Sequence, residues 1–215
     1  MPIRRRHWLI VAALFVIVLV VSVPGSRDTI LRSAGHLLVV SPSSEKSADI
    51  IVVAIDAQSG GTLKAADLVH AGVSNRVAVF DDPPTPADLE FIRRGLPYDD
   101  RAVTSTNQLH LLGIQNVEQV PRRTSGSEEE GEILPAWCAQ HGYRTVVLVA
   151  SADHSRRLSR ILRRSDRTSG IRTTVVSSPW SSFNPDSWWT TRAGIRTGIV
   201  ESEKLLLDCL RHPFS

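Results

Sequence analysis

The chain has few cysteines and no surplus of either charge over most of its length. Cys138 and Cys209 are the 2 cysteines among 215 residues, too few for a disulfide scaffold and without the spacing of a zinc site. Both fall in expected helices, which leaves buried thiols or one bridge open. The 25 basic residues include Arg4, Arg5 and Arg6, so the remaining 22 balance 22 acidic ones. This balance argues against a nucleic-acid-binding protein.

Internal repeats and low-complexity tracts are also missing from the sequence. Hydrophobic residues make up 42% of the chain and charged residues 22%, which is ordinary globular composition. The length after the N-terminal segment suffices for one sizeable core. We therefore expect one folded domain.

One long apolar run is present, from Trp8 to Val23, and only Ser22 interrupts it. As a helix it would reach about 24 Å, a little under the thickness of a bilayer core. The three arginines before it predict a cytoplasmic N-terminus and a domain outside the cytoplasm. A cleaved signal peptide, with Val23 and Gly25 near the cleavage site, is the alternative.

Beyond this run, the sequence divides into a connector and a domain. We assign residues 1–26 to the arginine cluster and a single-pass anchor in the cell membrane. Residues 27–47 form a connector, and residues 48–215 form the domain.

The domain alternates short apolar runs with helical patterns. Runs rich in β-branched residues predict strands buried on both faces. These runs are Ile50–Ile55, Arg76–Phe80, Asn116–Val120, Thr145–Ala150 and Ile171–Ser178. Helical periodicity fills the intervals and continues from about Trp188 to Leu210. The pattern predicts an α/β fold, a Rossmann-like three-layer sandwich with a mostly parallel sheet of about five strands, preceded by one transmembrane helix.

The stretch "VLVASADHSRRL" places polar side chains where the fourth strand gives way to a helix. His154 falls on the apolar face of that helix with Leu158, which directs it toward the sheet edge. Arg157 lies beside it, so a phosphate or carboxylate could bind at this helix start. A capping turn, with Ser151 or Asp153 as the cap, is the alternative. Four other arginines of the helix fall on an outer face that we expect to be solvated: Arg156, Arg160, Arg163 and Arg167.

Two other polar clusters follow predicted strands. Ser127 and Glu130 have capping-box spacing at the start of the preceding helix. Asp56, Asp81 and Asp82 follow the first two strands and could hold a hard cation. Aspartates in such places more often start turns and cap helices. No metal site is therefore predicted.

The segment "VVLVASADHSRRLSRIL" resembles the signature of the YdcF, SanA and ElyC family of bacterial envelope proteins, V-T-S-x-Y-H-x-x-R-A after a buried strand. Ser151, His154 and Arg157 occupy the matching positions. Ser127 and Glu129 match a Thr-x-Glu motif that opens the preceding helix in that family. The glycine-rich turns of the family are displaced to Gly60 and Gly61 or replaced by aspartates, and Asp153 stands in place of the signature tyrosine.

The resemblance implies a membrane-anchored, extracytoplasmic protein of cell-envelope biogenesis. Its ligand would be an anionic or phosphorylated small molecule or a lipid-linked envelope intermediate. Arg157 would bind the anionic group of this ligand. Glu129 and His154 would form an acid and base pair. The ligand site would also include Asp56, Ser127 and Ser151.

The residues specify neither a reaction nor a cofactor. The alternatives are a catalytically degenerate binding or scaffold protein and an S-adenosylmethionine-binding, transferase-like protein, because some relatives are described as binding that cofactor.

Overall fold

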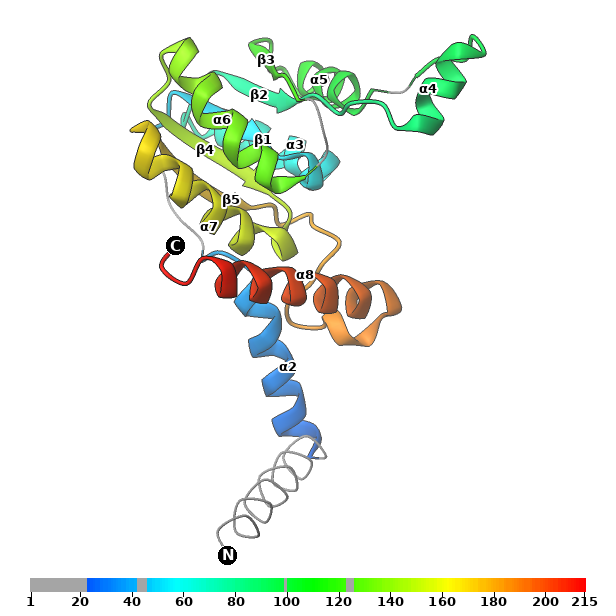
Figure 1. The fold of residues 1–215 in the computed structure, drawn as a ribbon, viewed down its shortest axis with the longest axis vertical. Helices are drawn as coiled ribbons and strands as arrows, with labels where there is room; N and C mark the ends of the chain where they lie inside the picture. The colour runs from blue at the N-terminus through cyan, green and yellow to red at the C-terminus, as the bar shows by residue number, and fades with distance from the viewer. Residues whose placement is uncertain (1–22, 42–45, 99, 123–125) are drawn as a thin grey trace, which may run out of the picture.

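The computed structural model describes residues 23–41, 46–98, 100–122 and 126–215, and its centre is a parallel five-stranded sheet (Figure 1). The strands lie in the order β3-β2-β1-β4-β5. Their bounds are β1 Ile50–Val53, β2 Val77–Phe80, β3 Val117–Val120, β4 Thr145–Ala150 and β5 Arg172–Ser177. The strand pattern of the sequence and the Rossmann-like α/β fold are thereby confirmed. The sheet is parallel throughout, because every paired strand runs in the same direction.

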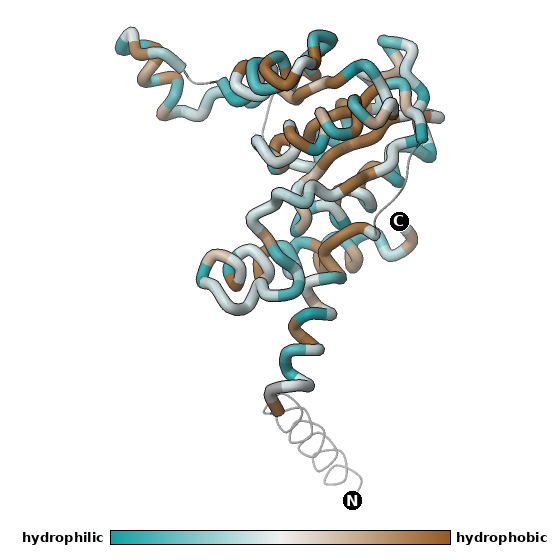
Figure 2. Tube along the Cα trace, turned by 180° about the vertical axis from the view of Figure 1, so that it is seen from behind, coloured by the Kyte–Doolittle hydropathy of each residue, from teal (hydrophilic) through white to brown (hydrophobic). Residues whose placement is uncertain are grey.

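Helices cover both faces of the sheet. One face packs against α3 (Gln58–His70) and α5 (Arg101–Leu111), and the other against α6 (Ser127–His141) and α7 (Ala152–Ser169). Successive residues of β1 therefore enter opposite cores, which explains an unbroken apolar run instead of an alternating one. Figure 2 shows the strands as a hydrophobic layer between the helices.

A further layer lies on the outer side of α7. It consists of α2 (Pro24–Leu38), the short η2 (Trp188–Thr190) and α8 (Arg192–Arg211), whereas α4 (Pro86–Arg93) projects from the opposite end (Figure 1). The expected connector thus includes a helix that packs on the domain. Leu38 and Val40 are buried, and the backbone N–H of Val40 donates to Ser155 Oγ at 3.0 Å. The folded unit therefore begins before residue 48.

Arg156 and Arg160 of α7 bind neighbouring elements, so the expectation of a solvated row was wrong for these two arginines, whereas Arg163 and Arg167 are exposed as expected. Arg160 Nε lies 2.6 Å from Asp208 Oδ2, and Arg164 Nη1 lies 2.8 Å from Asp208 Oδ1. Arg156 donates to the carbonyls of Leu37 and Val39. The cations on α7 bind an acid from α8 and carbonyls at the C-terminal end of α2, and these contacts hold the outer layer against α7.

The expected membrane anchor lies almost entirely outside the described residues. Within the ranges that the structure describes, no helix has the length and hydrophobicity needed to cross a bilayer.

Candidate functional site

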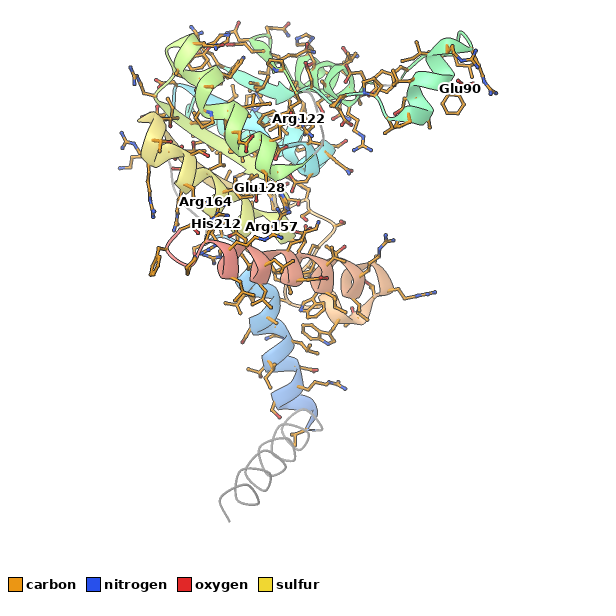
Figure 3. The ribbon with its side chains drawn as sticks, in the orientation of Figure 1. Glu90, Arg122, Glu128, Arg157, Arg164 and His212 are labelled. Carbon is orange, nitrogen blue, oxygen red and sulfur yellow. The ribbon has the colours of Figure 1, made fainter. Side chains whose placement is uncertain are left out.

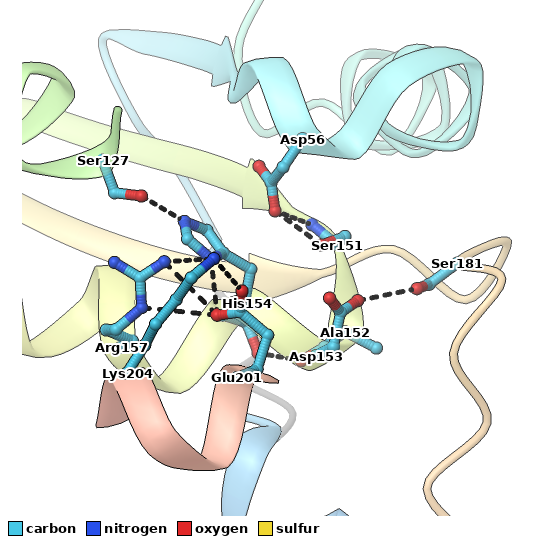
Figure 4. Close-up of polar contacts among 11 residues, drawn as sticks. Asp56, Ser127, Ser151, Ala152, Asp153, His154, Arg157, Ser181, Glu201 and Lys204 are labelled. Atoms are coloured by element: carbon cyan, nitrogen blue, oxygen red, sulfur yellow. Dashed lines mark hydrogen bonds and ion pairs between the residues drawn. The ribbon is translucent and has the colours of Figure 1, made fainter. Parts of the chain in front are cut away.

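The candidate site lies where the carboxyl edge of the sheet meets α8 (Figure 4). Asp56 belongs to the short η1 (Ile55–Ala57) after β1, and Ser151 separates β4 from α7. Ser127 is the first residue of α6, whereas His154 and Arg157 lie in the first turns of α7. The parallel topology opens these loops at one edge, as the sequence predicted.

The start of α6 differs from the predicted capping box. The N-cap is Gly126, which provides no side-chain cap and has φ +143°, a backbone conformation that favours glycine. Ser127 is therefore already helical, and its hydroxyl faces His154 instead of capping the helix. Further along α6, a Cβ at Gly131 would collide with the side chain of Ile161 on α7. The two helices thus approach closely, which brings Ser127 to His154.

Three side chains form a hydrogen-bonded relay. Ser127 Oγ lies 2.6 Å from His154 Nε2, and His154 Nδ1 lies 3.2 Å from Glu201 Oε2. His154 and Glu201 are each only 7% exposed. A hydroxyl, an imidazole and a carboxylate in this order match the arrangement in which a serine becomes a nucleophile.

Cations surround the carboxylate of the relay. Lys204 Nζ lies 2.6 Å from Glu201 Oε1, and Arg157 Nη2 lies 3.3 Å from Glu201 Oε2. Burial raises the pKa of the Glu201 carboxyl, but its hydrogen bonds with His154 and Lys204 outweigh burial and lower this pKa to about 2. Glu201 is therefore ionised at neutral pH.

The ring of His154 is tuned by opposing influences. Burial lowers the pKa of the ring, whereas the hydrogen bond to Glu201 and the charge of Asp56 raise it, and the net direction is upward from the ordinary value. Arg157 Nη2 also lies 2.8 Å from His154 Nδ1. When Nδ1 carries the proton, it donates to Glu201 and Nε2 can accept from Ser127. When Nε2 carries the proton, Nδ1 accepts from Arg157 and the ring is not a base toward Ser127.

Asp56 ties the loop after β1 to the loop after β4. Its Oδ2 accepts from the backbone N–H of Ser151 at 3.2 Å and from the Ser151 hydroxyl at 2.5 Å. Among the described residues, its buried Oδ1 has no hydrogen-bond partner. Asp153, mostly buried near Ser181, has a pKa raised chiefly by burial. These contacts between Asp56 and Ser151 join the loop after β1 to the start of α7.

Glu129, the other predicted acid, lies near a buried arginine. Arg122, which follows β3, lies 3.8 Å from Glu129 Oε2 and 3.4 Å from Glu130 Oε1. Glu130 also accepts from the backbone N–H of Ile55. Burial and the charge of Asp56 raise the pKa of Glu130 to about 7. Among the described residues the carboxylate hydrogen-bonded to His154 is that of Glu201, whereas Glu129 lies near Arg122, so the relay differs from the expected pair of His154 and Glu129.

A shallow, open surface cavity of about 520 Å³ has Ser127 in its lining. Its walls come from the first turns of α6 and from Arg157 and Lys204. No group of three or more His, Cys, Asp or Glu side chains in the described residues is placed to hold a metal ion. The arrangement of Ser127, His154 and Glu201 is suited to nucleophilic attack and proton transfer.

Sequence reasoning missed Glu201, Lys204 and Arg122. Glu201 is 47 residues beyond His154, in a helix that carries no motif. One signal was available, because Glu201 and Asp208 are seven residues apart and so share a face of α8. Two acids on one helix face complement the basic α7.

Comparisons with known proteins leave the family of this chain open. No protein-family model and no curated protein sequence matches it. Among solved structures, the rRNA methyltransferase AviRa from Streptomyces viridochromogenes is similar at a TM-score of 0.30 and 16% identity, over 74% of this chain and 78% of that one. A likeness this weak carries no conclusion about function.

Proposed function

We propose that this protein is a serine-dependent hydrolase or acyltransferase that acts on carboxylic esters. The observation that carries the proposal is the relay from Ser127 Oγ through His154 to Glu201, with spacings of 2.6 and 3.2 Å. The relay opens on a cavity large enough for a small ester.

The proposed reaction begins with His154 as general base. As Ser127 Oγ bonds to the ester carbonyl carbon, its proton passes to His154 Nε2, and the carbonyl electrons move to the oxygen. The tetrahedral adduct then collapses, the alcohol leaves with the proton from Nε2, and an acyl-serine remains. Water, or an acceptor alcohol in a transferase, releases the acyl group by the same steps. Glu201 orients the ring and stabilises the imidazolium.

The helix start provides a place for the developing oxyanion. Ser127 occupies the first turn of α6, where backbone N–H groups have no partner within the helix. We assign these N–H groups as hydrogen-bond donors to the oxyanion, and the acidic first turn, Glu128 to Glu130, opposes the helix dipole there.

The biological setting in this proposal follows from the sequence. The arginines before the apolar run favour an N-terminal anchor with the domain outside the cytoplasm. The resemblance to the YdcF, SanA and ElyC family favours a role in the cell envelope. The substrate would then be an anionic or lipid-linked envelope ester.

Turnover of 4-nitrophenyl butyrate by the full chain tests the proposed chemistry. Ser127→Ala should lower kcat/KM at least about 10³-fold, because the nucleophile is lost. Ser202→Ala, on the exposed surface of α8 next to Glu201, is the matched control and should retain full activity. Equal activities of Ser127→Ala and wild type would contradict the proposal.

A non-catalytic binding protein is the second candidate. The contact of Arg157 with His154 Nδ1 favours it, since a ring held in that tautomer cannot take the proton of Ser127. Absence of esterase activity in the wild type, with an intact fold, would favour this candidate.

A further inference from the structure

A second cavity extends the one at Ser127 along α8. It measures about 240 Å³ and shares Glu128, Arg157 and Lys204 with the first cavity. Beyond these shared residues it reaches Leu207 and Arg211. Figure 3 shows Glu128, Arg157, Arg164 and His212 near the meeting of α6, α7 and α8. The two cavities therefore adjoin one another at these shared residues, and we refer to them together as the groove.

The charges in the middle of this groove are largely paired. Lys204 and Arg157 hold Glu201, as described above. Arg164 Nη2 lies 3.5 Å from Glu128 Oε2, and the same arginine with Arg160 neutralises Asp208. A charged ligand group bound at the middle of the groove would have to compete with these ion pairs.

The two ends of the groove, by contrast, carry unlike charges. Arg211 lines only the α8 end and Glu132 only the α6 end. In the part of the chain that the structure describes, neither side chain has an ion pair within 4.0 Å. An anionic group is therefore attracted to the α8 end and repelled from the α6 end.

From this polarity we infer that the substrate is an ester whose acyl part carries a carboxylate or phosphate group, with that anion bound at Arg211. The identity of the reaction rests on the proposed function, whereas the anion site does not. Leu207 lies between Lys204 and Arg211 in sequence and also lines this cavity. Its side chain is 44% exposed and can contact a short methylene spacer of the substrate. The ester then lies toward Ser127, and Arg211 is a specificity-determining residue.

Paired substrates test this inference. The full chain is assayed with 4-nitrophenyl butyrate, which is neutral, and with the mono-4-nitrophenyl ester of glutarate, which carries an anion. Arg211→Gln should raise KM for the glutarate ester about 10-fold, leave kcat within about twofold, and leave both constants for butyrate unchanged. Arg211→Lys should recover part of the loss, and Glu132→Gln should not raise KM for the glutarate ester.

A binding measurement separates this inference from the proposed reaction. A glutarate monoamide with a neutral fluorophore is titrated with wild-type protein and followed by fluorescence anisotropy. Binding that Arg211→Gln weakens supports the anion site even if no ester is hydrolysed. Equal binding by wild type and Arg211→Gln, or an equal rise of KM for both esters, would overturn the inference.

Discussion

Two cavities open at the carboxyl edge of the same sheet, and they differ in what surrounds them. The cavity over β1 and β2, about 250 Å³, is lined mainly by apolar and uncharged polar groups, among them Ser105 and Gln108, with Arg101 at its wall. The cavity at Ser127 adjoins a buried histidine, an ionised carboxylate and two cations. Position at the strand ends is common to both. The charged relay belongs to only one of them, so we assign the chemistry to that cavity.

The largest effect is expected from removing the charge of the relay. Glu201→Gln should lower kcat/KM about 10²- to 10³-fold, because the amide no longer stabilises the imidazolium. Gln108→Ala in the other cavity should change it less than twofold. Equal effects of the two variants would remove the distinction between the cavities.

The pH profile sharpens the same comparison. A base must be neutral, so the rate of wild type should fall as the pH drops through the raised pKa of His154. In Glu201→Gln the ring loses the hydrogen bond and charge that raise its pKa, and the inflection should move to lower pH. An unmoved inflection would show that Glu201 does not act on the ring.

Glu130, which is buried beside Arg122, should make the stability of the fold depend on pH. The pKa of Glu130 is near 4.5 in the unfolded chain and about 7 in the fold. The folded state therefore binds the extra proton between these values, and the free energy of unfolding falls as pH rises through this window, by about 3 kcal/mol for such a shift.

Glu130→Gln isolates this contribution. Chemical denaturation of wild type and variant between pH 4 and 8 should show a difference that grows up to about pH 7 and then levels off. The decline caused by His154, whose pKa is also raised, is common to both proteins. A constant difference across the range would mean that Glu130 does not titrate there.

A smaller effect is expected at the contact that sets the relay geometry. Gly131→Ala should lower the free energy of unfolding by about 1 to 3 kcal/mol, because the new methyl collides with Ile161. It should also move Ser127 away from His154 and lower kcat/KM about 10-fold. The double variant with Ile161→Leu, which lacks the clashing Cγ2 methyl, should recover part of both losses, and Gly25→Ala, where space is open, should change neither.

The strands and some site residues could be predicted from the sequence, and other site residues could not. β1, β2 and β4 were predictable because each is a short apolar run buried on both faces, whereas β3 and β5 are only partly buried and were predictable from their β-branched residues. His154 was predictable because its position on the apolar face of α7 directs it inward. Ser127 was named as part of the site, but its cap role was wrong, since Gly126 takes the cap position. Glu201 and Arg122 could not be placed, because only tertiary packing brings α8 and the segment after β3 to this edge.

The most direct test of the central claim is covalent labelling of the nucleophile. A fluorophosphonate reacts with an activated serine hydroxyl, whose oxygen bonds to phosphorus as fluoride leaves. After treatment of the full chain, peptide mass spectrometry should locate the adduct on Ser127, with none on Ser105 in the other cavity and a much slower reaction in His154→Ala. An adduct confined to another serine, or no difference in labelling rate between wild type and His154→Ala, would contradict a Ser127–His154–Glu201 catalytic relay.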